Sequence, residues 1–316
     1  MNTNHVKEEQ KKSIVNISII SFISIVMISI SLYFYATEIE RKLVTVTWNE
    51  IEASTIPKEF HNKKILQFSD VHLGPEFTLK QLENLVEKMN ALRPDVVVFT
   101  GDLIDKFGSY KAEREEAKGI LQKIHAPLGK YAVFGNHDRG GGGSLFYKKY
   151  MEEAGFTVLV NEVQKIKAEN GKYITISGLD DFLLGEPQID STLKHVRQED
   201  FNMLLVHEPD VVDKVTRYPV DVQLSGHSHG GQVQIPFIGP LITTKLAESH
   251  VEGMYELEGK NKPLYLYVNR GIGTTRMPVR FWSVPELSVF VLKQNSNQCI
   301  QFHIIILNLI LMNERC

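Results

Sequence analysis

The sequence contains almost no cysteine. Its 316 residues include two, Cys299 and Cys316, and both lie within the last eighteen positions. The preceding part of the chain therefore has neither thiols for a disulfide framework nor a thiolate metal site. Any metal ion bound there must be held by histidine, carboxylate or amide side chains.

An excess of charge of either sign is also absent. The chain has 35 lysines and arginines against 38 aspartates and glutamates, which gives a net charge of −3. Proteins that bind nucleic acid commonly carry a basic surface that neutralises phosphates. We therefore expect no nucleic-acid partner, and no segment of the sequence implies a protein partner.

One long segment, residues 13–37, has no charged residue. About 20 apolar residues suffice to cross a bilayer, so we expect a single transmembrane helix here. Lys11 and Lys12 precede the segment, and the positive-inside rule then places residues 1–12 in the cytoplasm and the body outside, although Arg41 and Lys42 follow it. A cleaved signal peptide is the alternative, but the apolar run is long for one and lacks a small-x-small cleavage site.

The remaining chain divides into a connector, a domain and an extension. We expect a connector at residues 38–62, with one possible strand in LVTVTW, and an extension of unassigned role at residues 294–316. Between them, in residues 63–293, short apolar strands alternate with amphipathic helices. One helix is predicted after Thr78, its N-cap, and before Pro94. Because strands follow one another later in the chain, the pattern predicts an α/β domain with mixed sheets covered by helices.

Polar side chains follow five of the predicted strands, at the point where each strand ends. In open α/β sheets, ligands bind at the carboxyl ends of the strands. Isolated D-x-H or G-D pairs are common as ordinary turns, but this ordered series is hard to obtain by chance. The residues concerned are Asp70 and His72, Asp102, the run Asn136, His137 and Asp138, then His207, and finally His227 and His229.

These residue types suit a site for two divalent metal ions. Two neighbouring cations need a bridging carboxylate, and neutral imidazole or carbonyl ligands complete each coordination shell. Asp102 is the candidate bridge, and Asn136 offers an amide oxygen. His227 and His229, separated by one residue, could each bind a different ion.

The ordered motifs D-x-H, G-D, G-N-H-D, a lone H and G-H-x-H resemble the calcineurin-like metallophosphoesterase superfamily. The resemblance covers residues 63–293, and the segments SGHSHGGQVQIPFIGPL and NRGIGTTRMPVRFWSVPELSVF are similar to its membrane-associated bacterial branch of YkuE- and YaeI-like phosphodiesterases. It implies a four-layer α/β/β/α sandwich of two mixed β-sheets flanked by helices, here preceded by one N-terminal transmembrane helix. It also implies a metal-dependent hydrolase of phosphoric esters.

The resemblance assigns roles to the residues at the strand ends. Asp70, His72, Asp102 and His229 would hold one metal ion, and Asp102, Asn136, His207 and His227 would hold the other. The ligand set admits Mn, Fe, Zn or Co. A metal-activated hydroxide would attack phosphorus, while His137, oriented by Asp138, would protonate the leaving group.

Three further residues are candidates for substrate binding: Arg139, His250 and Arg276. Arg139 begins a glycine-rich loop, His250 is placed to line a pocket, and Arg276, together with Arg280, could contact a phosphate. The segment GDLIDKFG has Lys106 where protein phosphatases of this superfamily carry an arginine, which argues against a phosphoprotein substrate.

The expected function is hydrolysis of phosphodiester or pyrophosphate bonds by a membrane-anchored enzyme. A lipid-linked substrate fits the anchor, and some relatives of this branch hydrolyse UDP-2,3-diacylglucosamine. Two alternatives stay open at this point. One is a phosphomonoesterase or nuclease of the same superfamily, and the other is a membrane-tethered metal-binding protein without turnover.

Overall fold

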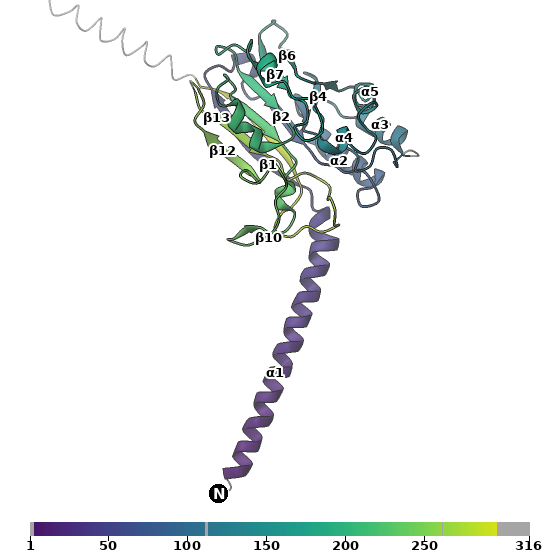
Figure 1. Ribbon diagram of the computed structural model, residues 1–316, viewed down its shortest axis with the longest axis vertical. Coiled ribbons are helices and arrows are strands. Elements are labelled where there is room, and N and C mark those ends of the chain that lie inside the picture. Colours follow the sequence, from purple (N-terminus) through teal and green to yellow (C-terminus); the bar gives the residue numbers. More distant parts are fainter. Residues whose placement is uncertain (1–2, 111–112, 261, 296–316) are drawn as a thin grey trace, which may run out of the picture.

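The computed structural model describes residues 3–110, 113–260 and 262–295. Helix α1 (Thr3–Phe34) projects from the body as a long rod (Figure 1) and continues through a π-helical turn, η1 (Tyr35–Ile39), and a 3-10 turn, η2 (Glu40–Lys42). In the described part of the chain, Ser13–Lys42 is the one helical stretch long and apolar enough to cross a membrane, and none of its most apolar window is buried. Most of the extension expected at 294–316 lies outside the described residues.

The first sheet has the strand order β1-β14-β2-β3-β4-β5. Strands β2 to β5 are parallel, β14 is antiparallel to β2, and β1 is parallel to β14. The strands are β1 (Thr45–Ala53), β14 (Glu286–Gln294), β2 (Lys64–Phe68), β3 (Val96–Phe99), β4 (Lys130–Ala132) and β5 (Thr157–Val158).

The second sheet has the order β12-β13-β9-β8-β7-β6. Its four central strands are parallel and both edge strands are antiparallel to their neighbours. The strands are β12 (Gly253–Leu257), β13 (Leu264–Val268), β9 (Val222–Ser225), β8 (Asn202–Leu205), β7 (Tyr173–Gly178) and β6 (Glu162–Lys167). A separate small hairpin pairs β10 (Gln234–Ile235) with β11 (Gly239–Pro240).

The two sheets pack face to face, and helices cover their outer faces. Ile65 of β2 and Met203 of β8 belong to the core between the sheets. Leu66, the next residue of β2, instead packs with α2 (Leu79–Ala91), α3 (Arg114–Gln122) and α5 (Tyr147–Glu153). Leu204 of β8 packs on the other outer side with α6 (Ile189–Leu193) and α7 (Val212–Val215). Since both faces of each central strand are buried, apolar residues occupy both faces of these strands, and the predicted α/β/β/α sandwich is confirmed.

The sequence pattern located the interior elements better than the edges. Helix α2 begins as predicted, because Thr78 and Gln81 form a capping box. The segment expected as a connector with one possible strand in LVTVTW contains β1, which pairs with β14 of the first sheet over nine residues. Strands β6 and β12 were not predicted, because both are edge strands in which many side chains are exposed.

Candidate metal centre

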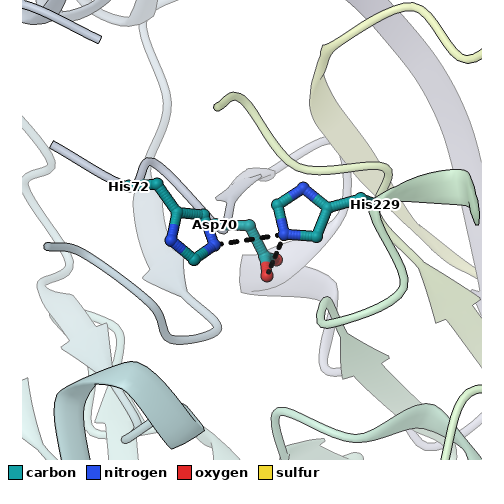
Figure 2. Close-up of side chains that lie close together, drawn as sticks. All are labelled: Asp70, His72 and His229. Carbon is teal, nitrogen blue, oxygen red and sulfur yellow. Dashed lines mark hydrogen bonds and ion pairs between the residues drawn. The ribbon is translucent and has the colours of Figure 1, made fainter. Parts of the chain in front are cut away.

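The seven residues expected to bind metal meet at one place, where loops leave the carboxyl ends of strands from both sheets. Asp70, His72 and His229 form a first group, here called the Asp70 cluster. Figure 2 shows the imidazoles of His72 and His229 directed toward one another with the Asp70 carboxylate beside them. The two Nε2 atoms are 3.1 Å apart, and Nε2 of His229 lies 3.4 Å from Oδ1 of Asp70.

Asp102, His207 and His227 form a second group, the Asp102 cluster. Oδ2 of Asp102 lies 3.3 Å from Nε2 of His207, and Nδ1 of His227 lies 3.2 Å from the same nitrogen. The same carboxylate oxygen is 3.7 Å from Nε2 of His72, in the Asp70 cluster. Asp102 therefore lies between the two clusters, as a bridging ligand must.

Backbone carbonyls set the tautomers of two rings in the Asp102 cluster. Nδ1 of His207 lies 2.7 Å from the carbonyl oxygen of Thr100, and Nε2 of His227 lies 2.9 Å from that of Lys245. A carbonyl only accepts, so these nitrogens carry the hydrogen. In the neutral rings, the two nitrogens 3.2 Å apart then both present lone pairs, and either a proton on His207 or a metal ion between the rings stabilises this arrangement. The donor set fits a metal ion.

Asn136 supplies a further candidate metal ligand, an amide oxygen that accepts no hydrogen bond among the described residues. It is the first residue of the short helix α4 (Asn136–Arg139), and its Oδ1 atom is buried without a hydrogen-bond partner among the described residues. The backbone N–H of its neighbour His137 donates to Oδ1 of Asp102 at 2.8 Å. A buried amide oxygen without a partner is costly, and a metal ion beside Asp102 would satisfy it.

The backbone at the centre is in a rarely populated conformation. Five of the seven candidate ligands have a positive φ, which few residues other than glycine adopt. Such strain is held by the surrounding structure and gathers at functional sites. The angles are 51° at Asp70, 48° at His72, 61° at Asp102, 68° at His227 and 52° at His229.

Two glycines make room for the carboxylates. A Cβ atom on Gly135 would lie 2.2 Å from Oδ1 of Asp102, and one on Gly226 would lie 2.3 Å from Oδ2 of Asp70. No side chain fits at such distances. The glycines of G-N-H-D and G-H-x-H are therefore required by the close approach of a neighbouring loop.

The protonation states at the centre suit metal binding at Asp102, His227 and His229, whereas His207 holds a proton that a metal ion must displace. Burial alone would lower the pKa of the His207 imidazole, but the Asp102 carboxylate outweighs burial and raises this pKa well above its usual range. Burial alone would raise the pKa of the Asp102 carboxyl, but the neighbouring His207, His72 and His137 outweigh it and hold this pKa well below its usual range. Burial, helped by nearby positive charge, lowers the pKa of the imidazoles of His227 and His229. An ionised carboxylate and neutral imidazoles are the forms that bind metals.

His137 lies at the edge of the centre, with its ring 4.7 Å from that of His72. Nδ1 of His137 donates a hydrogen bond to the backbone carbonyl oxygen of Asp105 at 2.9 Å. We expected Asp138 to orient His137, but in the structure the hydrogen bond to the His137 ring is made by Asp105. The Asp138 carboxylate instead accepts hydrogen bonds from three backbone N–H groups. The donors are Asp102 at 2.7 Å, Leu103 at 3.0 Å and Gly135 at 2.9 Å. Asp138 thus ties the G-D and G-N-H-D loops together.

The candidate substrate-binding residues are not brought together. Arg139 is already paired, with Nη2 2.6 Å from Oδ1 of Asp180. His250 donates a hydrogen bond from Nδ1 to Oδ1 of Asp210 at 2.9 Å. Arg276 lines a cavity of about 260 Å³ that also borders His229.

Arg280, which the sequence offered as a residue that could contact a phosphate, has a structural role. Its side chain is fully buried and donates to the carbonyl oxygens of Gly273 and Ser283, and its Nη2 lies 3.4 Å from Nδ1 of His229. Burial lowers the pKa of its guanidinium to about 10, so it remains charged at neutral pH.

Sequence reasoning missed the support that the turn η2, which follows α1 and η1, gives to this centre. Glu40 is buried, and its Oε1 accepts a hydrogen bond from the backbone N–H of Ser283 at 2.7 Å. The Ser283 hydroxyl in turn donates to the carbonyl oxygen of His229 at 2.8 Å. The one local signal was a glutamate three residues after the uncharged run, and a glutamate at such a place is also typical of an exposed residue.

Comparisons with known proteins agree with this geometry. Residues 63–231 match the family described as Calcineurin-like phosphoesterase. The metallophosphoesterase YkuE of Bacillus subtilis is 44% identical over 264 residues, which are 84% of this chain and 91% of the relative. A metallophosphoesterase of Aquifex aeolicus is 31% identical, over 83% and 96% of the two chains. The UDP-2,3-diacylglucosamine pyrophosphatase LpxG of Chlamydia trachomatis is 29% identical, over 81% and 91%.

Proposed function

This chain belongs to the calcineurin-like phosphoesterase family, and we propose that it is a membrane-anchored, two-metal hydrolase of phosphodiester or pyrophosphate bonds in a lipid-linked substrate. Membership makes it a metal-dependent hydrolase of phosphoric esters. The observation that carries the finer proposal is the pair of Asp and His clusters that lie on either side of Asp102.

Each cluster would hold one divalent ion. The Asp70 cluster with Asp102 supplies two carboxylates and two imidazoles, and Asp102 with His207, His227 and Asn136 supplies one carboxylate, two imidazoles and an amide oxygen. Ligands of this kind suit Mn, Fe, Zn or Co. When bound, the ions supply Lewis acidity to water and to the phosphoryl oxygens.

His137 is the proposed proton donor to the leaving oxygen. Its Nδ1 hydrogen bond to Asp105 fixes the ring and leaves Nε2 to hold the proton that is transferred. Burial lowers the pKa of this imidazole, but the carboxylates of Asp102, Asp105 and Asp138 outweigh burial and raise it above its ordinary value. A larger fraction of the ring is therefore protonated near neutral pH. A positioned acid of this kind contributes about 10² to 10⁴-fold in rate.

The proposed location rests on α1. Its long exposed apolar surface suits a bilayer, and Lys11 and Lys12 before the span favour an extracytoplasmic body. A membrane anchor keeps the centre close to lipid-linked substrates. A relative named as a pyrophosphatase of a diacylated nucleotide sugar supports this substrate class.

Metal analysis followed by a substrate screen tests the proposal. The purified full chain should contain two divalent ions and should hydrolyse bis(p-nitrophenyl) phosphate or a UDP-linked diacyl lipid faster than p-nitrophenyl phosphate or DNA. A preference for the monoester or for DNA would favour the phosphomonoesterase or nuclease alternative. Two bound ions without turnover on any of these substrates would favour a metal-binding protein.

A further inference from the structure

A second apolar surface lies outside α1. It lies mainly on residues 230–244, which include the hairpin of β10 and β11. None of these residues is charged. At the turn, Phe237 is fully exposed and Ile238 is 79% exposed. Contiguous exposed apolar side chains mark a surface that contacts a membrane or a partner. This hairpin surface comprises Ile235, Phe237, Ile238, Leu241, Ile242, Met277 and Trp282.

Hydrogen bonds join the hairpin to the loop that carries Met277 and Trp282. The backbone N–H of Gln234 donates to the carbonyl oxygen of Phe281 at 2.8 Å, and the Gln232 side chain donates to that of Met277 at 3.0 Å. The two segments are therefore one structural unit.

The same loop is attached to the turns η1 and η2, which continue directly from α1. The backbone N–H of Arg280 donates to the carbonyl oxygen of Ala36 at 3.1 Å, and that of Ser283 donates to Glu40. Figure 1 shows the β10 hairpin beside the point where α1 meets the body. The hairpin surface is thus held next to the end of the helical stretch that carries the apolar span.

We infer that the hairpin surface inserts into the membrane leaflet from which α1 emerges, and that it forms a second contact with lipid. The inference rests on the proposed membrane anchor, because α1 places the hairpin at the bilayer. Lipid is favoured over a protein partner because the surface adjoins a span that lipid itself must cover, and because its residues at the hairpin are uncharged. Insertion removes the exposed phenylalanine, isoleucine and leucine side chains from water.

The contact has a consequence for the metal centre. The cavity of about 260 Å³ is lined by Leu241, Ile242 and Met277 of the hairpin surface on one side and by Ser228 and His229 on another. With the hairpin in lipid, this cavity would open toward the leaflet. A hydrocarbon chain attached to a phosphoester could then enter it beside a metal ligand.

Fluorescence quenching in proteoliposomes tests the inference on the full chain. In a background of Cys299→Ser and Cys316→Ser, single cysteines at Phe237, Leu145 and Ile23 carry an environment-sensitive label. The vesicles contain phosphatidylethanolamine, phosphatidylglycerol and a lipid with a spin-labelled acyl chain. Leu145 is the matched control, since it is 88% exposed in the loop before α5, and Ile23 reports on the span.

The label at position 237 should be quenched by the spin-labelled lipid at least about threefold more than the label at 145, and it should be shielded from aqueous iodide. Equal iodide access at 237 and 145, with lipid quenching at 23, would overturn the inference and leave the anchor intact. Shielding at 237 without lipid quenching would also overturn it, in favour of a protein contact. Absence of lipid quenching at 23 would overturn the anchor itself.

A second measurement uses the double variant Phe237→Ser and Ile238→Ser. It should lower turnover of a UDP-linked diacyl lipid in vesicles about tenfold and leave hydrolysis of bis(p-nitrophenyl) phosphate unchanged, whereas Leu145→Ser should change neither rate. Unchanged turnover of the lipid by the double variant would contradict a contribution of the inserted hairpin to substrate access.

Discussion

The two ligand clusters contain the same residue types but are supported differently. In the Asp102 cluster, carbonyl oxygens of Thr100 and Lys245 fix both histidine rings. In the Asp70 cluster, Nδ1 of His72 lies 3.6 Å from the partly exposed Asp105 carboxylate, which is beyond hydrogen-bond distance. His229 depends on the loop that carries Arg280 and Ser283. Because outer hydrogen bonds orient metal ligands, we expect the Asp102 cluster to be the more rigid of the two and to retain its ion longer.

The largest effect is expected at Asp102, which the two clusters share. Asp102→Asn removes the bridging charge, so metal content should fall from two ions to one or fewer and turnover should fall by about 10³-fold. Elemental analysis and diester hydrolysis measure both quantities. Asp213→Asn, at an exposed residue of α7, is the control. Retention of both ions by Asp102→Asn would contradict the bridging role.

His137→Ala should separate chemistry from metal binding. We expect kcat to fall by about 10² to 10⁴-fold with two ions retained, because this side chain belongs to the proton-transfer step. Steady-state kinetics measures kcat, and elemental analysis measures the number of ions that the variant retains. If an ion were lost with the side chain, His137 would act as a ligand instead, and unchanged turnover would exclude it as the acid.

Ser283→Ala should distinguish the two clusters. It removes the hydroxyl that holds the carbonyl oxygen of His229, and loss of such a support weakens metal binding by about 10- to 100-fold. Titration with a chelator should therefore remove one ion at a lower chelator concentration than in the parent protein and leave the other unchanged. Ser109→Ala, at an exposed position, is the control. Equal weakening of both ions would show that the clusters are not independent.

The smallest effect is expected far from both clusters, at Thr78. Thr78→Ala removes the hydroxyl that caps α2, which should lower the free energy of unfolding by about 1 kcal/mol. Thermal or denaturant unfolding measures the change, and Thr78→Ser, which retains the hydroxyl, should restore most of it. Metal content and turnover should match the parent; a change in either would mean that α2 supports the centre.

Most of the central fold was accessible from local pattern. The apolar runs around Leu66 and Leu204 predicted strands buried on both faces, and the packing of each strand between a sheet and helices explains why. Edge strands were harder, because β6 and β12 lack such a run. The pairing of β1 with β14 was not predicted either. These two strands lie about 240 residues apart in the chain, and nothing in the local sequence of one strand indicates that the other is its partner.

The sequence by itself determined which side chains gather at the candidate metal centre and that an apolar helix precedes the body. Both follow from local properties: residue type at the end of a strand, and the length of an uncharged run. Only the tertiary structure decided how the ligands divide around Asp102, which carbonyls set the tautomers of His207 and His227, and that Asp105 rather than Asp138 contacts the His137 ring. It also decided that Glu40 and Ser283 connect the turn η2, which follows α1 and η1, to His229. These features depend on contacts between distant segments, which form when the two sheets pack and have no counterpart in local sequence.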